Sequence, residues 1–129
     1  MGRSGQTKIP AILIQRYDKI VALEEAREIL TNLSRHEKGI DAEIEFILQR
    51  VENLENDLRN SEPEAMAIID RFSNNSTDWT AARLHFIQGY TWEAAALKMG
   101  VSRDAARMSV YRAFEKASAD KASSKGKEA

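Results

Sequence analysis

The 129-residue sequence contains no cysteine, only two prolines and only two histidines, which stand 49 positions apart. The absence of cysteine excludes disulfides and thiolate zinc sites, and the separation of the histidines argues against a structural metal. Long apolar runs are also missing, because charges at Arg16, Asp18 and Lys19 follow the short run from Ile9 to Ile14. This pattern predicts neither a signal peptide nor a membrane-spanning helix. We therefore expect a soluble cytoplasmic protein with one domain, or with one small domain plus an extension.

Apolar residues recur at spacings of three and four through nearly the whole chain, and alternating runs of β-branched residues are lacking. This periodicity predicts an all-α protein. A first helix is expected from Pro10 to about Leu33, because a proline in the first turn of a helix loses no hydrogen bond. Its apolar face is formed by Leu13, Tyr17, Ile20, Leu23, Ala26 and Leu30.

Residues 40–58 carry the sharpest periodicity, with apolar residues spaced 4, 3, 4, 3 and 4 apart. These residues are Ile40, Ile44, Ile47, Val51, Leu54 and Leu58. The pattern is an a/d seam of about two and a half heptads, which fits a coiled coil with a second copy or a partner, or an amphipathic helix packed within its own chain. Residues 34–41 are either a turn or part of one long helix. We favour a helical hairpin, with Gly39 ending one helix and Asp41 capping the next, because it hides both apolar stripes.

Charge and composition divide the chain, since residues 1–77 carry 10 basic and 14 acidic side chains whereas residues 78–117 carry 6 and 4. Ser61 and Pro63 predict a further helix start, with the helix running to about Phe72. We expect a flexible N-terminus over residues 1–9, an acidic helical or coiled-coil region over 10–72, a linker over 73–77, a helix-turn-helix unit over 78–118 and a disordered tail over 119–129.

The C-terminal unit begins with two predicted short helices that carry capping signals. Thr77 or Asp78 caps the first helix, which ends at Gly89, and Thr91 caps the second, which ends at Gly100. The core face of the first helix is formed by Ala81 and Leu84, together with either Phe86 or Ile87. Small residues in the second helix let another helix cross closely, as a compact helix-turn-helix requires.

A third helix is predicted over about 102–118, with Ser102 as its cap. The side chain of Val101, in the preceding turn, is expected to be buried in the core and to plug the turn there. Its inner stripe consists of Ala106, Val110, Ala113, Phe114 and Ala117. Its outward side chains are Arg103, Arg107, Met108, Tyr111 and Arg112. This layout is typical of a recognition helix, whose first outward side chains contact base edges in the major groove while later ones meet phosphate.

Arginines on one face of a single helix are more often a solvated surface, and a net charge of +2 over residues 78–117 is small for a DNA-binding unit. The capped helices and the Gly-Val-Ser turn, at helix-turn-helix spacing, favour DNA binding over that simpler interpretation. Arginine also suits the role, because its planar fork bonds guanine in two places, for about 1–3 kcal/mol of discrimination per pair.

Residues 83–117, RLHFIQGYTWEAAALKMGVSRDAARMSVYRAFEKA, resemble region 4 of sigma-70 type factors. They are more closely similar to the small sigma-region-4-like regulators encoded in phages and prophages of Gram-positive bacteria, which also place an acidic helical segment before this unit. The resemblance covers about 35 residues well. It implies a transcription regulator in a bacterial cytoplasm that binds double-stranded DNA and needs no cofactor. Its front helices would give homodimerisation or contact with RNA polymerase.

The resemblance also implies roles for individual residues. Base readers would be Arg103, Asp104, Arg107 and Met108. The recognition helix would be capped by Ser102, and the DNA backbone would be touched by Thr91 and Arg112. The chain departs from the family at Ala95 and Ala106, which are smaller than the usual core residues, and at Ser109, which is often apolar. The core is therefore either loosely packed or completed by the N-terminal helices.

Two other functions stay open from the sequence. One is a phage small terminase subunit, in which a helix-turn-helix marks viral DNA, and the other is a protein-interaction module in which residues 40–58 bind a partner. An enzyme is not expected, because Asp78 and His85 have no nucleophile or oxyanion arrangement beside them. Trp79 and Trp92 are expected in the core or at an interface rather than stacked on bases.

Overall fold

A computed structural model describes residues 9–35, 41–73 and 75–128 of the chain, with side chains described as far as residue 117. Every element in these ranges is helical and none is a strand, so the predicted all-α fold is confirmed. The elements are α1 (Ala11–Leu33), α2 (Asp41–Phe72), α3 (Ser76–Ala82), the π-helical turn η2 (Arg83–Ile87), α4 (Trp92–Met99) and α5 (Arg103–Glu128). None of these described helices is both long and apolar enough to cross a membrane.

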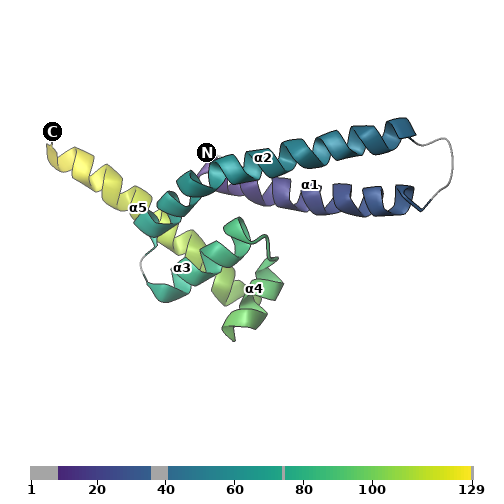
Figure 1. The fold of residues 1–129 in the computed structure, drawn as a ribbon. Helices are drawn as coiled ribbons and strands as arrows, with labels where there is room; N and C mark the ends of the chain where they lie inside the picture. Colours follow the sequence, from purple (N-terminus) through teal and green to yellow (C-terminus); the bar gives the residue numbers. More distant parts are fainter. Residues whose placement is uncertain (1–8, 36–40, 74, 129) are drawn as a thin grey trace, which may run out of the picture.

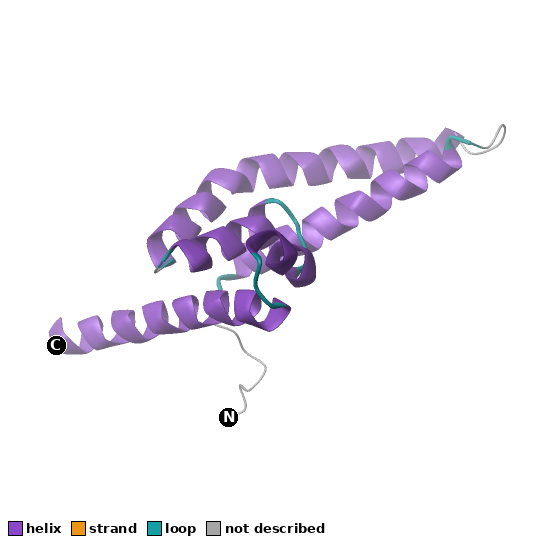
Figure 2. Ribbon diagram, turned by 90° about the horizontal axis from the view of Figure 1, so that it is seen from below, coloured by secondary structure: helices purple, strands orange, loops and turns teal. Residues whose placement is uncertain are grey.

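Helices α1 and α2 lie side by side and run in opposite directions, forming a hairpin that projects from the other helices (Figure 1). We call this hairpin the arm. Its tip is the end near Leu33 and Asp41, and its root is the end that contacts the remaining helices. The hairpin alternative is thus the one observed, while Gly39 and Ile40 lie outside the described residues. Figure 2 shows the same arm from below, with the end of α5 on the opposite side of the molecule from the arm tip.

The a/d seam of α2 is used within the arm. Leu54 is buried, and the other described seam residues are half-buried where α2 packs along α1: Ile44, Ile47, Val51 and Leu58. On the α1 side, Leu23 and Ala26 are buried, in agreement with their predicted apolar face. Of the two alternatives for the seam, packing within the chain is therefore the one observed, since the neighbouring helix already removes these side chains from water.

Helix α2 passes through Ser61 and Pro63 without interruption, so the helix start predicted there is wrong. Ser61 Oγ accepts a hydrogen bond from Arg16 Nη1 at 2.7 Å and donates one to the Leu58 carbonyl at 3.3 Å, so it caps no helix. Pro63 is exposed and has no N–H to donate to the carbonyl of residue 59. That residue, Arg59, is exposed as well. Long-range packing against α1 thus overrides the local capping signal.

One apolar core joins the arm root to the C-terminal helices. Leu13 of α1, Ile69 of α2 and Val110 of α5 are the largest fully buried side chains. The core is formed by Ile9, Leu13, Ala65, Ile68, Ile69, Ala81, Ala82, Phe86, Ala96, Ala106, Val110 and Phe114. Both Ala95 and Ala106 are fully buried, and Ala106 belongs to the same core cluster as residues of α1 and α2. The acidic front and the C-terminal unit therefore share one core.

Glycines end two helical segments as predicted, with φ of +81° at Gly89 and +74° at Gly100. A β-carbon at Gly89 would overlap Ile20 Cγ2 on α1, so both the backbone conformation and the lack of space require glycine there. The surroundings of Gly100 are open, and its role is conformational: its left-handed backbone lets the Val101 N–H reach the Ala96 carbonyl at 3.1 Å.

Three boundaries differ from the prediction. Ile9, predicted to be the end of a flexible N-terminus, is buried in the core. Asn75, rather than Thr77 or Asp78, caps α3, because its Oδ1 accepts the Asp78 N–H at 2.9 Å. The run SNNSTD offers several side chains able to cap, so the sequence leaves the start of this helix ambiguous by a few residues. Helix α5 runs to Glu128, where a disordered tail over 119–129 was predicted. Alanine and lysine have high helix propensity, and they extend a helix whose first turns are packed.

Candidate nucleic-acid interface

Helices α4 and α5 are joined by residues 100–102, and each begins at a predicted cap. Thr91 Oγ1 accepts the Ala94 N–H at 3.0 Å, and Ser102 Oγ accepts the Ala105 N–H at 3.0 Å. Both predicted caps are confirmed, and they define where the first turn of each helix meets solvent. The predicted DNA-facing residues therefore come from the start of α4, the connecting turn and the first turns of α5.

The two faces of α5 differ as predicted. Its inner stripe is buried at Ala106, Val110, Ala113 and Phe114, and half-buried at Ala117. Phe114 meets Phe72 of α2 edge to face, with ring centroids 5.5 Å apart, so the inner stripe rests on the arm root as well as on α3 and α4. The outer face is exposed at Arg103, Asp104 and Arg112, and half-buried at Arg107 and Met108. Tyr111, predicted on this outer face, is instead half-buried and packs against the core.

Two of the outer arginines have neighbours on α5 itself. Arg103 Nη2 lies 3.3 Å from Asp104 Oδ1, in a pair whose side chains are 61% and 69% exposed. Such an exposed pair contributes under about 1 kcal/mol, so it does not prevent Arg103 from turning to another acceptor. The guanidinium of Arg107 lies over the Tyr111 ring, 5.2 Å from its centroid, which favours one orientation of the side chain.

Val101 does not plug the turn into the core, and this prediction is wrong. The side chain is 39% exposed, beside the 84% exposed Leu97 of α4. The left-handed turn at Gly100 is closed by backbone hydrogen bonds, and the buried Ala96 of α4 and Ala106 of α5 belong to the core without it. Small buried residues let two helices pack closely, so the core does not require the valine side chain at this turn.

His85 is a packing residue. Its ring is stacked between Tyr17 of α1 and Trp92 of α4, with centroids 4.0 and 3.8 Å away. Its Nδ1 lies 2.7 Å from the Tyr90 carbonyl, which can only accept, so Nδ1 carries the proton. Burial lowers the pKa of His85 to about 4, outweighing the opposite effect of that hydrogen bond, so the ring is neutral at neutral pH. Trp92 is half-buried against the core, in agreement with the expectation that it lies in the core or at an interface.

Arg16 is a buried structural residue that the sequence patterns did not predict. It is 3% exposed, and its guanidinium donates to the Phe86 carbonyl at 3.1 Å, the Leu58 carbonyl at 2.6 Å and Ser61 Oγ at 2.7 Å. Burial lowers its pKa from the usual arginine value, and nearby Glu62 opposes that shift. The available signal was its spacing of three residues from Leu13, which places it on the apolar stripe of α1.

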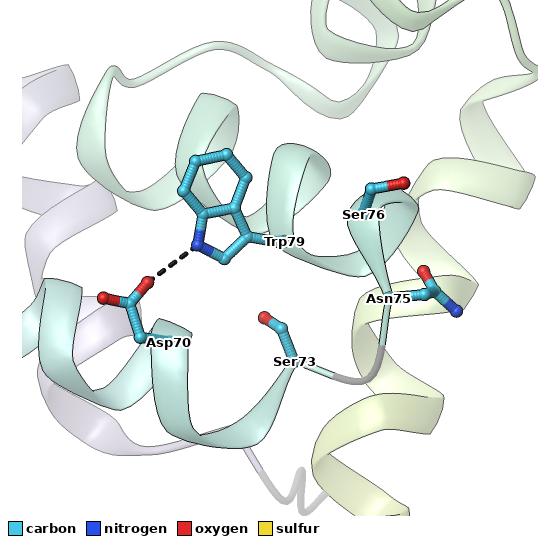
Figure 3. Close-up of a pocket in the computed structure, with 5 residues that line it drawn as sticks. All are labelled: Asp70, Ser73, Asn75, Ser76 and Trp79. Carbon is cyan, nitrogen blue, oxygen red and sulfur yellow. Dashed lines mark hydrogen bonds between the residues drawn. The ribbon is translucent and has the colours of Figure 1, made fainter.

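Trp79 connects α3 to the end of α2. Its Nε1 donates to Asp70 Oδ1 at 2.7 Å, as Figure 3 shows, and the Arg83 guanidinium lies 4.6 Å from its ring centroid. The shallow hollow beside it, about 310 Å³, is lined by Asp70, Ser73, Asn75, Ser76 and Trp79. The ring is therefore held between two charged groups at an interface of helices, as expected, although it is still 36% exposed.

No group of three or more histidine or acidic side chains among the described residues is arranged to hold a metal ion. No protein-family model matches the chain, and comparisons with curated proteins and with solved structures give no match either. The resemblance of residues 83–117 to sigma region 4 therefore stays a prediction from the sequence.

Proposed function

We propose that the protein is a sequence-specific DNA-binding transcription regulator in which α4 and α5 act as a helix-turn-helix of the sigma-region-4-like type. The observation that carries the proposal is the two-sided character of α5. Its inner face is buried on a shared core, and the opposite face of its first turns carries charged side chains in solvent. A rigid helix that presents such a face fits the major groove of B-DNA.

Arg103 and Arg107 are the side chains that distinguish base pairs in this proposal. A guanidinium bonds O6 and N7 of guanine together, which gives about 1–3 kcal/mol of discrimination per pair. The weak exposed pair between Arg103 and Asp104 exchanges for contacts with DNA, and the released carboxylate accepts a hydrogen bond from a cytosine amino group. Met108 supplies an apolar contact for a thymine methyl group.

The remaining predicted residues hold the DNA backbone. The hydroxyls of Thr91 and Ser102 accept backbone N–H groups as caps, and each keeps an O–H to donate to a phosphate. Arg112, exposed on α5, supplies a phosphate contact further along the helix. RNA polymerase is a further partner that the resemblance implies. A homodimer through the α2 seam is not part of the proposal, because those residues pack against α1.

The proposal is tested by selecting bound fragments from the source genome at two salt concentrations. The proteins are the wild type, Arg103→Ala/Arg107→Ala and, as a charge-matched control, Arg50→Ala/Arg59→Ala, which removes two exposed arginines from α2. We expect the wild type and the control to enrich the same few sites. The α5 variant should lose that enrichment by at least about tenfold, since each guanine contact is worth about 1–3 kcal/mol.

Equal enrichment by the α5 variant would contradict the role of the two arginines. Binding by all three proteins that shows no preferred site and disappears at the higher salt concentration would contradict specific recognition, since that behaviour is the electrostatic, sequence-independent part of DNA binding.

A further inference from the structure

The arm tip bears an apolar groove that the proposed DNA interface does not use. The groove has a volume of about 450 Å³ and is lined by Ile29, Leu33, Ala42, Glu43, Phe46 and Ile47. Its floor and walls come from the last turns of α1 and the first turns of α2. Phe46 and Ile29 are 70% and 47% exposed, although they are among the largest apolar side chains of the arm.

Folding of the arm does not account for this exposure. The a/d seam of α2 packs along α1, whereas Phe46 stands one residue away from Ile47 of that seam and faces solvent. A phenylalanine left in water forgoes up to about 1.5–3 kcal/mol of burial free energy. Contiguous exposed apolar residues with a charged rim are typical of surfaces that bind another protein.

The net negative charge of the outer half of the arm favours one kind of partner. Residues 24–35 and 41–55 carry eight acidic and three basic side chains, and one of those bases, Arg27, is paired with Glu55 at 2.5 Å. Glu43 is one of the residues beside the groove, and its side chain is exposed. A second copy of the arm would bring the same negative charge to the contact, so electrostatics disfavours self-association and favours a basic partner.

We propose that this groove binds an amphipathic helix of another protein, with apolar anchors spaced three and four residues apart and lysine or arginine along its flanks. The anchors cover Phe46 and Ile29, as in other helix-in-groove complexes. The basic flanks meet the carboxylates of the arm. The same negative charge keeps the arm away from nucleic acid, so partner binding at the tip and DNA binding at α5 use separate surfaces.

The test measures binding of the full-length protein to two labelled synthetic peptides of equal length and identical leucine spacing. One peptide has lysine at every flanking position and the other has glutamate. Fluorescence anisotropy gives Kd for the wild type, Phe46→Ser and Glu43→Lys. Leu48→Ser is the matched control, because Leu48 is a 49% exposed apolar residue of the same helix that does not line the groove.

We expect the wild type to bind the lysine peptide at least about tenfold more tightly than the glutamate peptide, as complementary charge requires. Loss of the aromatic anchor in Phe46→Ser should weaken binding of the lysine peptide by about tenfold, and Glu43→Lys should weaken it by about threefold. Leu48→Ser should stay within about twofold of the wild type. Circular dichroism melts check that each variant is folded. We expect all three to fold, because the substituted residues are exposed.

Three results would overturn the proposal. Equal binding of both peptides would mean that the apolar contact has no charge preference. An unchanged Kd for Phe46→Ser would place the peptide elsewhere. Concentration-dependent self-association of the wild type that Phe46→Ser abolishes, measured by sedimentation, would show that a second copy covers the groove.

Discussion

The two ends of the arm use the same two helices in opposite ways. At the root, Leu13 is fully buried and even the guanidinium of Arg16 is enclosed by hydrogen-bonding partners. At the tip, Phe46 and Ile29 remain largely in solvent beside a surplus of carboxylates. The difference does not arise from helix type or composition alone. It reflects what lies next to each end: α3, η2, α4 and α5 cover the root, and no described element covers the tip.

The largest effect should come from removing an apolar side chain at the root. Leu13→Ala should lower the free energy of unfolding by about 2–5 kcal/mol, because it opens a cavity in the shared core. The matched change at the tip, Phe46→Ala, should alter it by less than about 0.5 kcal/mol, since the side chain is 70% exposed. Urea unfolding of each variant, followed by circular dichroism, measures both values. If both variants lost a similar amount of unfolding free energy, the root and the tip of the arm would not differ in their contribution to stability.

The next effect concerns pH and the stacked His85 at the root. Its pKa of about 4 lies below the ordinary value of 6.5, so the unfolded chain binds more protons between these two pH values. The stabilising contribution is therefore complete above pH 6.5 and is lost as the pH falls toward 4, by roughly 3 kcal/mol in total. His85→Phe keeps an aromatic ring in the stack without a titrating nitrogen. Denaturant unfolding across this range should show a shallower pH dependence for the variant, and identical slopes would contradict a neutral buried histidine.

The smallest effect separates two glycines with similar backbone conformations. Gly89→Ala should destabilise the protein by roughly 2–3 kcal/mol, because the new methyl group meets Ile20 of α1 in addition to the strain of a positive φ. Gly100→Ala should cost only about 1–2 kcal/mol, because open space surrounds that turn. Thermal and urea unfolding of both variants gives the comparison. If Gly100→Ala were the more damaging change, the turn at Gly89 would not be pressed against the arm root.

Local signals were sufficient for much of the fold. The caps at Thr91 and Ser102 and the end of α4 at Gly100 depend on residues within a few positions of one another, and all three were predicted correctly. Ser61 and Pro63 misled the prediction, because a distant arginine, rather than the backbone at the start of a helix, uses the serine hydroxyl. Sequence periodicity describes neighbouring turns of one helix, so it cannot predict a contact between residues 45 positions apart.

The candidate sites were predictable to different degrees. The buried and exposed faces of α5 follow from its periodicity, since Ala106, Val110 and Phe114 are small or apolar at helical spacing. DNA binding by its outer face stays a prediction. The groove at the arm tip was not predicted, because Phe46 falls outside the seam and its significance appears only when α1 is in place beside it. An aromatic residue directly next to a regular apolar seam is a signal of such a surface that periodicity alone does not reveal.

The three acceptors of Arg16 bear on how the chain reaches its native state. They come from residues 42, 45 and 70 positions away, and two of the three are main-chain carbonyls that no side-chain substitution removes. A guanidinium that loses its water before all three acceptors are in place carries a desolvation cost without compensation. Half-assembled states with α1 docked on only one neighbour are therefore penalised, which couples closure of the arm to docking of η2 in a single cooperative transition.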